Sequence, residues 1–150
     1  MRPSSPLPAF LRAILMAFVF AYAAPAAFAV VDDAHSTALE TAIGEVKKGF
    51  KIRQEYWKGK ITSGEQTMVK HQLFKGSDVW FWLATSTPKV KIEIEIYDDK
   101  GTKVAVEKKE VKDCTGIKLT APKTGTYRIV FKMTGKEKAE IDWALVYGWK

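Results

Sequence analysis

Cysteine is almost absent from this chain, which has 150 residues and a single cysteine, Cys114. A disulfide within the chain needs two cysteines, so the stability of the fold must come from a buried apolar core. Cys114 stands between Asp113 and Thr115-Gly116, a context that favours a turn. It is an incidental residue, a free thiol or a thiol that pairs between two chains, and a catalytic thiol would need a histidine beside it.

Histidine is nearly as scarce, since the sequence contains only His35 and His71. Neither belongs to a His-Glu-x-x-His metal motif, and no Gly-x-Ser-x-Gly sequence presents a nucleophilic serine. Catalytic triads are defined by geometry rather than by spacing, so a hydrolase with an unrecognised site around His71 stays as the third functional hypothesis. The sequence predicts a binding protein rather than an enzyme.

Concentrated basic clusters with interleaved aromatic residues are also missing, although the formal net charge is +7. The lysines are spread along the whole chain, which argues against nucleic-acid binding. A mildly basic protein can meet anionic polymers or acidic proteins, and plain solubility is the alternative explanation of the charge. The expected partner is therefore a protein or an envelope polysaccharide.

The longest uncharged apolar run, residues 13–23, lies near the N-terminus. Arg2 and Arg12 precede it, and Ala27-Phe28-Ala29 matches a small-x-small cleavage site. These features predict a secretory signal peptide over residues 1–29 and a periplasmic or secreted location. A transmembrane anchor is the alternative, but the run is short for roughly 30 Å of hydrocarbon, so we expect no membrane span after signal removal.

A helical pattern follows over residues 30–50. Four apolar residues recur at spacings of four, three and four, as on one stripe of an amphipathic helix: Leu39, Ile43, Val46 and Phe50. Lys47 and Lys48 suit the negative end of the helix dipole, and Gly49 suits a left-handed C-terminal cap. We expect the stripe to pack on the rest of the domain, residues 51–150.

From residue 51 onward the apolar period changes to two, which is typical of strands with one buried face. In Lys91-Ile92-Glu93-Ile94-Glu95-Ile96-Tyr97 the isoleucines share one face, and Asp98-Asp99-Lys100-Gly101 follows as a turn. Residues 79–84 are apolar throughout, so both faces of that strand should be covered. Five residues of the last strand share one face: Ile141, Trp143, Leu145, Tyr147 and Trp149. Short strands between regular turns predict a mainly β protein, an antiparallel β-sandwich with one N-terminal helix.

Five segments occur in a recognisable order: 59–65 (GKITSGE), 73–76 (LFKG), 79–81 (VWF), 96–101 (IYDDKG) and 121–127 (APKTGTY). This order resembles the bacterial pre-peptidase C-terminal domain, a jelly-roll-like β-sandwich often appended to secreted peptidases. The Golgi-dynamics (GOLD) type of sandwich has a similar rhythm. The resemblance covers roughly residues 56–131 and implies a non-catalytic, exported accessory domain, although these 150 residues contain no peptidase domain.

Three aspartates in or beside predicted turns offer the hard oxygen ligands that calcium prefers: Asp78, Asp98 and Asp99. No EF-hand loop is present. Aspartate before Lys-Gly is also ordinary turn chemistry, which is the alternative to a metal site. Beyond this candidate calcium site the sequence predicts no cofactor.

Trp80 and Trp82 share one face of the continuous apolar strand, opposite Val79, Phe81 and Leu83. If the latter three fill the core, two flat rings lie on the outer face, where they can stack on sugar rings. The alternative is that the N-terminal helix covers both rings, and the other three tryptophans are expected in the core or at its rim. The leading hypothesis is an exported accessory module that contacts protein or envelope partners. The second is a carbohydrate-binding module that uses Trp80 and Trp82.

Overall fold

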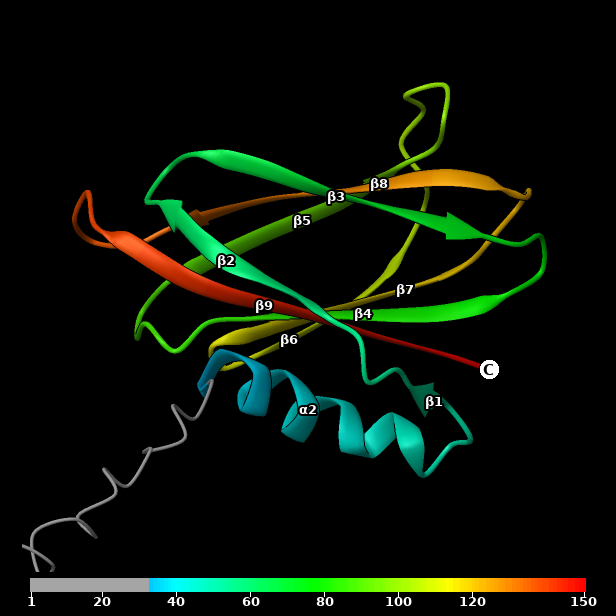
Figure 1. Ribbon diagram of the computed structural model, residues 1–150, viewed down its shortest axis with the longest axis horizontal. Coiled ribbons are helices and arrows are strands. Elements are labelled where there is room, and N and C mark those ends of the chain that lie inside the picture. Colours follow the sequence, from blue (N-terminus) through cyan, green and yellow to red (C-terminus); the bar gives the residue numbers. More distant parts are fainter. Residues whose placement is uncertain (1–32) are drawn as a thin grey trace, which may run out of the picture. The chain divides into compact units, whose positions relative to one another are not determined.

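Two antiparallel β-sheets stack face to face in the computed structural model, which describes residues 33–150 (Figure 1). Sheet A has six strands: β1 (Lys51–Ile52), β2 (Trp57–Thr62), β4 (Asp78–Ala84), β6 (Glu107–Val111), β7 (Cys114–Thr120) and β9 (Glu140–Trp149). Sheet B has three strands: β3 (Gln66–Leu73), β5 (Lys91–Tyr97) and β8 (Gly125–Thr134). The predicted mainly β sandwich is confirmed.

The strands of sheet A are ordered β1-β9-β4-β7-β6, and β2 pairs with the same edge of β9 as β1 does. Sheet B is ordered β3-β8-β5. Successive strands alternate between the sheets from β2 to β6 and again from β7 to β9. The chain therefore crosses the sandwich repeatedly, along a jelly-roll-like path, and brings distant segments together.

The core between the sheets is built from the inward faces of alternating strands. In β5, Ile92, Ile94 and Ile96 are buried, while Glu93 and Glu95 lie on the half-exposed outer face, as the alternation predicts. The inward residues of β8 and β9 behave in the same way: Tyr127, Ile129, Phe131, Met133, Ile141 and Leu145. Full burial of one such side chain stabilises the fold by roughly 1.5–3 kcal/mol.

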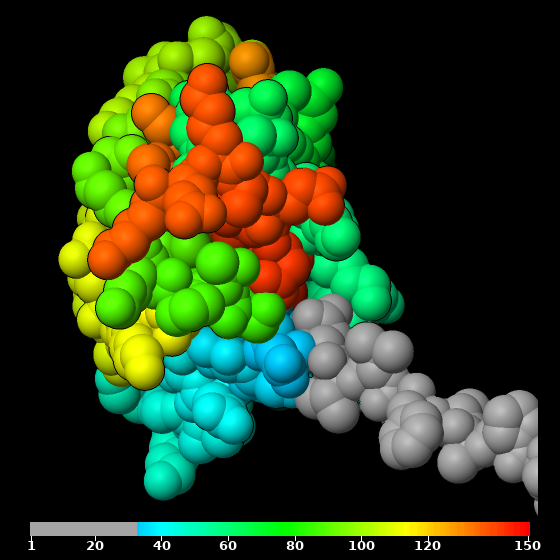
Figure 2. Space-filling model, turned by 90° about the vertical axis from the view of Figure 1, so that its left-hand side faces the viewer, coloured from blue at the N-terminus to red at the C-terminus, as the bar shows by residue number. Residues whose placement is uncertain are grey.

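Strand β4 is covered on both faces, as its continuous apolar sequence predicts. Val79, Phe81 and Leu83 join the core between the sheets. Trp80 and Trp82 face the other way, beneath α2 (Asp33–Val46), which lies against the outer face of sheet A (Figures 1 and 2). Sheet A thus has a hydrophobic cluster on each face.

The predicted apolar stripe packs on sheet A only in part, since Phe50 is buried in the cluster beneath the helix and Leu39 is partly buried against it. The buried residues of α2 are three alanines and a glutamate: Ala34, Ala38, Ala42 and Glu45. Ile43 and Val46 are instead 53% and 45% exposed. The prediction was wrong for these two residues because the large rings of Trp80 and Trp82 already fill the space under the helix, so small side chains fit best there.

Of the predictions for the N-terminal part of the chain, only those for residues 33 onward can be compared with the structure. The predicted signal peptide, residues 1–29, lies outside the described residues. Gly49 closes the turn after α2 with φ of +94°, the left-handed conformation that its predicted capping role requires. Within residues 33–150, no helix is both long enough and apolar enough to cross a membrane.

Candidate functional site

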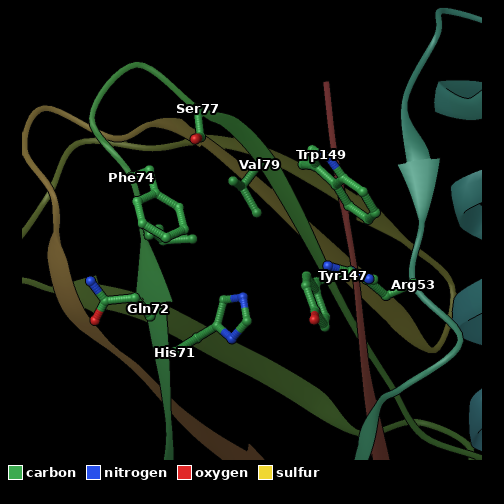
Figure 3. Close-up of a pocket in the computed structure, with 9 residues that line it drawn as sticks. Arg53, His71, Gln72, Phe74, Ser77, Val79, Tyr147 and Trp149 are labelled. Atoms are coloured by element: carbon green, nitrogen blue, oxygen red, sulfur yellow. The ribbon is translucent and has the colours of Figure 1, made fainter.

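A pocket of about 280 Å³ opens at the side of the sandwich, where β3 of sheet B faces the C-terminal half of β9 (Figure 3). Ligand sites occupy roughly 300–1,000 Å³, so this pocket has room for one small ring-shaped group. Its lining comes from β3, the β3–β4 turn, the start of β4, the end of β9 and the segment that follows β1. Sheets A and B therefore both contribute.

The pocket opens where the chain passes from β1 to β2 along the edge of β9. Strand β1 pairs with the end of β9 and β2 with its first half, and between them the Arg53 N–H donates to the Tyr147 carbonyl oxygen at 3.0 Å. Gly148 permits this approach, because a Cβ there would lie 2.9 Å from the Lys51 carbonyl oxygen. The inward rings of Tyr147 and Trp149 consequently border the open side of the sandwich.

Aromatic rings occupy much of the pocket wall. His71 and Tyr147 lie side by side, with their ring centroids 4.4 Å apart, and Figure 3 shows Phe74 and Trp149 on either side of the open centre. Phe74 is 65% exposed, so its ring is accessible to a ligand. Flat rings of this kind provide stacking faces at low conformational cost.

Polar groups stand between these rings. The guanidinium carbon of Arg53 lies 4.4 Å from the centroid of the Trp149 ring, in a cation–π contact. Ser77 adds a hydroxyl to the lining, whereas the Gln72 amide points away from the open centre and its Oε1 accepts a hydrogen bond from the Thr126 hydroxyl (Figure 3). A largely aromatic pocket with a few placed polar groups is typical of small-molecule binding sites.

His71 is the titratable group at the bottom of this pocket. The rings of Trp57, Phe81 and Tyr147 surround it. Burial lowers the pKa of His71 below its ordinary value, and the positive charge of Arg53 lowers it further. The imidazole is therefore neutral at neutral pH, with one ring nitrogen able to donate a hydrogen bond and the other able to accept one.

The hydrolase hypothesis placed its base at His71. Ser77 lines the same pocket, but no hydrogen bond joins it to His71 within residues 33–150, and the described lining contains no carboxylate to orient the imidazole. A serine hydrolase needs serine, base and orienting acid in hydrogen-bond contact.

Trp80 and Trp82 do not form a surface platform in this structure. They are 3% and 0% exposed, their rings stack on each other at a centroid distance of 5.8 Å, and α2 covers them. The interpretation with two outward rings is corrected accordingly, because burying both rings against Ala38 and Ala42 removes a large apolar area from water. The alternative in which the helix covers them describes the structure.

Asp98 and Asp99 lie together after β5 and share one lysine. The Nζ atom of Lys123 is 3.0 Å from Asp98 Oδ2 and 2.8 Å from Asp99 Oδ1. Asp98 Oδ1 also accepts hydrogen bonds from the N–H groups of Lys100 and Thr102 at 2.9 and 2.8 Å. The Thr102 N–H and then Lys123 lower the pKa of Asp98, which keeps the carboxylate ionised inside its turn.

Asp78, the third residue of the candidate calcium site, is held elsewhere. Its carboxylate accepts a hydrogen bond from the Thr120 hydroxyl at the start of β4. In the described part of the chain, no group of three or more His, Cys, Asp or Glu side chains is arranged to hold a metal ion. A calcium ion at Asp98 and Asp99 would have to displace the Lys123 ammonium, so turn formation accounts better for these residues.

Cys114 lies at the start of β7, buried beneath α2. Burial raises the pKa of its thiol to about 11, and a smaller interaction with Thr41 lowers it. A reactive cysteine needs the opposite shift, because the thiolate is the nucleophile. His35 stacks on Tyr56 at a centroid distance of 3.7 Å, and His71 lies in the pocket on the other face of sheet A. The thiol therefore packs as a small apolar group.

Sequence reasoning weighed His71 but did not single out Arg53, Phe74 or Ser77. The aromatic residues at alternate positions of the last strand could have indicated the pocket, since Tyr147 and Trp149 continue its inward face.

Comparison with protein-family models and with curated protein sequences gives no match to this chain. The case for a function therefore depends on the fold and on this pocket.

Proposed function

We propose that this chain is an exported, non-catalytic binding module that holds a sugar ring of an envelope polysaccharide in the pocket between β3 and β9. The observation that carries the proposal is the lining, where the rings of Phe74, Tyr147 and Trp149 stand beside the His71 imidazole and the Ser77 hydroxyl. A sugar ring has an apolar C–H face and a rim of hydroxyl groups. Aromatic rings suit the first, and imidazole and hydroxyl side chains suit the second.

Two features of the sequence support this proposal. The predicted signal peptide, residues 1–29, would carry the domain to the envelope, where such polymers occur. The resemblance to the pre-peptidase C-terminal domain is a resemblance to a non-catalytic accessory domain. Without Arg2 and Arg12 of the predicted signal peptide the formal net charge falls from +7 to +5, which still favours meeting anionic envelope polymers.

The hypothesis of sugar stacking on Trp80 and Trp82 has less support than the pocket. A glycan would reach those rings only if α2 left sheet A, since both are buried beneath it. Phe74 needs no such rearrangement, because it is 65% exposed at the pocket mouth. Carbohydrate recognition is therefore assigned to the pocket.

The test is retention of the folded protein on insoluble envelope polysaccharide, compared between two variants. Phe74→Ala should weaken retention several-fold, because an aromatic contact is worth about 0.5–1.5 kcal/mol beyond its buried area. Met68→Ala is the control, since Met68 is 50% exposed on the outer face of sheet B and outside this pocket.

Unchanged retention of Phe74→Ala would contradict the proposal. Retention that disappears when the polysaccharide is first treated with protease would identify a protein as the partner, and would also overturn it. Equal losses in Phe74→Ala and Met68→Ala would place the binding surface outside the pocket.

A further inference from the structure

The pocket lining carries a positive charge and no negative charge. It contains Arg53 and His71 and no aspartate or glutamate. Among the ion pairs of residues 33–150, several exposed lysines have carboxylate partners, as Lys60 has Glu140 at 3.2 Å, whereas Arg53 has none. The pocket therefore presents a positive charge without a protein carboxylate to neutralise it.

Strand β9 fixes the position of this charge. The backbone N–H of Arg53 is bonded to Tyr147, and its guanidinium lies over the Trp149 ring, so both ends of the residue are held against β9. A guanidinium stacked through its face keeps its N–H groups directed outward in its own plane. Two parallel N–H donors match the two oxygens of a carboxylate.

His71 adds hydrogen bonding without a second full charge. Its ring lies 4.4 Å from the Tyr147 ring, and Figure 3 shows it facing the same open centre as the Arg53 side chain. Burial and the charge of Arg53 lower its pKa, so the imidazole is neutral when the pocket is empty. Selection for an anion then depends on Arg53, while His71 is placed to contact hydroxyl groups.

We infer that the pocket selects an acidic sugar: Arg53 binds the carboxylate of a uronic acid ring whose apolar face stacks on Phe74. This inference rests on the proposed function, because it names the class of sugar that the same pocket takes. The two contacts come from opposite sides of the pocket, Phe74 from the β3–β4 turn and Arg53 from the segment after β1 (Figure 3). A ligand that satisfies both must carry its charge at the edge of its ring.

The experiment is an NMR titration of the ¹⁵N-labelled protein with methyl β-D-glucuronide and, separately, methyl β-D-glucoside. The two glycosides differ only at C6, which is a carboxylate in one and a hydroxymethyl group in the other. We expect the glucuronide to bind about tenfold more tightly, because a hydrogen bond to a charged group exceeds a neutral one by that order. The Trp149 indole signal should shift with the glucuronide.

Two variants locate the source of that preference. Arg53→Gln removes the charge and should bring the two dissociation constants together. Lys136→Gln makes the same change of charge in the β8–β9 turn, at the opposite end of β9 from Trp149, and should leave the ratio unchanged. Arg53→Lys keeps the charge without the paired donors and should retain part of the preference, which keeps the contact testable if Arg53→Gln fails to fold.

The outcomes separate this inference from the proposed function. Equal affinity for both glycosides overturns the acidic-sugar inference and leaves a neutral sugar site standing. A preference that survives Arg53→Gln, or that disappears in Lys136→Gln, also overturns it. No shift at the pocket with either glycoside overturns both proposals. Sodium acetate that binds as tightly as the glucuronide would show that the pocket takes any carboxylate and no sugar ring, which overturns both as well.

Discussion

Gly116 makes room for the two tryptophans that α2 covers. A Cβ at this position would lie 3.0 Å from Trp82 Cδ1 and 3.2 Å from Trp80 Cζ3. Both rings are buried and stacked on each other, so neither can move aside without disturbing the other. Because Gly116 of β7 has no side chain, the two stacked rings fit between α2 and sheet A.

Replacing Gly116 by alanine should destabilise the domain by about 1–3 kcal/mol, the usual cost of overpacking a core. Gly44→Ala is the matched control and should stabilise it by about 1 kcal/mol, because Gly44 lies in α2, where an added Cβ would meet no neighbouring side chain or strand within 4 Å. Urea denaturation measures both changes. Stabilisation by Gly116→Ala would show that the tryptophan pair has room to shift.

The pKa of His71 provides a second test at the residue scale. Titration by ¹H NMR should give a value below 6.5, and Arg53→Gln should raise it toward 6.5, since one of the two causes of the shift is removed. Arg53→Lys, which keeps the charge, should leave the pKa low. If Arg53→Gln left the pKa of His71 unchanged, the charge of Arg53 would have no effect on the imidazole.

The same shift affects stability in acid. The unfolded state binds a proton near pH 6.5, whereas the folded state binds it only at lower pH. Stability contributed by neutral His71 is thus present above pH 6.5 and lost as the pH falls from there through the folded-state pKa. Chemical denaturation should show that His71→Gln has a smaller loss of stability over this range than the unmodified protein.

At the scale of elements, α2 is held on sheet A by small side chains and one buried carboxylate. Ala38 and Ala42 are fully buried against the tryptophan pair. Glu45 is also buried, and its Oε1 lies 3.0 Å from Lys48 Nζ and 3.8 Å from Lys109 Nζ of β6. Cys114 lies in the same cluster, so its thiol reports whether the helix is in place.

Ala42→Glu should release α2 from the sheet, because an unpaired carboxylate would be buried against Trp80 and Trp82. An unpaired buried charge costs about 3–5 kcal/mol, so the reaction of Cys114 with a thiol reagent should accelerate by roughly two to four orders of magnitude. Release would also remove the burial that raises the thiol pKa to about 11. Ile43→Glu introduces the same side chain one position away, where the residue is 53% exposed, and should leave the rate unchanged. Equal acceleration in both variants would mean that the added charge exposes the thiol whether or not it disrupts the packing beneath α2.

At the scale of the whole domain, sheet A separates two hydrophobic clusters. The larger lies between the sheets, and the smaller lies beneath α2. Trp80 and Trp82 belong to the smaller cluster, whereas Trp57, Trp143 and Trp149 are only partly buried at the margin of the larger one. The five tryptophans therefore differ in exposure according to the face of the sheet on which they lie.

Quenching of tryptophan fluorescence by acrylamide should reproduce this division. Replacing Trp80 and Trp82 by phenylalanine should leave the quencher-accessible emission unchanged, since the two rings are 3% and 0% exposed. Trp149→Phe should reduce that emission, because Trp149 lines the open pocket. Loss of accessible emission in the Trp80→Phe/Trp82→Phe variant would mean that α2 leaves the sheet in solution.

Local patterns were sufficient to predict much of the sandwich. The inward faces of β5 and β9 follow from alternation, because successive side chains of a strand point to opposite faces whatever their neighbours are. The covering of β4 on both faces follows from its continuous apolar sequence. The turn at Asp98–Gly101 was visible in the same way, and Gly101 closes it with a positive φ of +83°.

The face that α2 presents, the partner of Asp98 and Asp99, and the pocket were decided only by tertiary structure. Ala34, Ala38 and Ala42 repeat with the same helical period as the larger apolar stripe, so periodicity cannot choose between them; the volume of Trp80 and Trp82 beneath the helix does. Periodicity records which side chains share a face of one element. What each face meets depends on segments far away in the chain, and the pairing of β1, β2 and β9 that brings Arg53 to Trp149 exists only in the folded molecule.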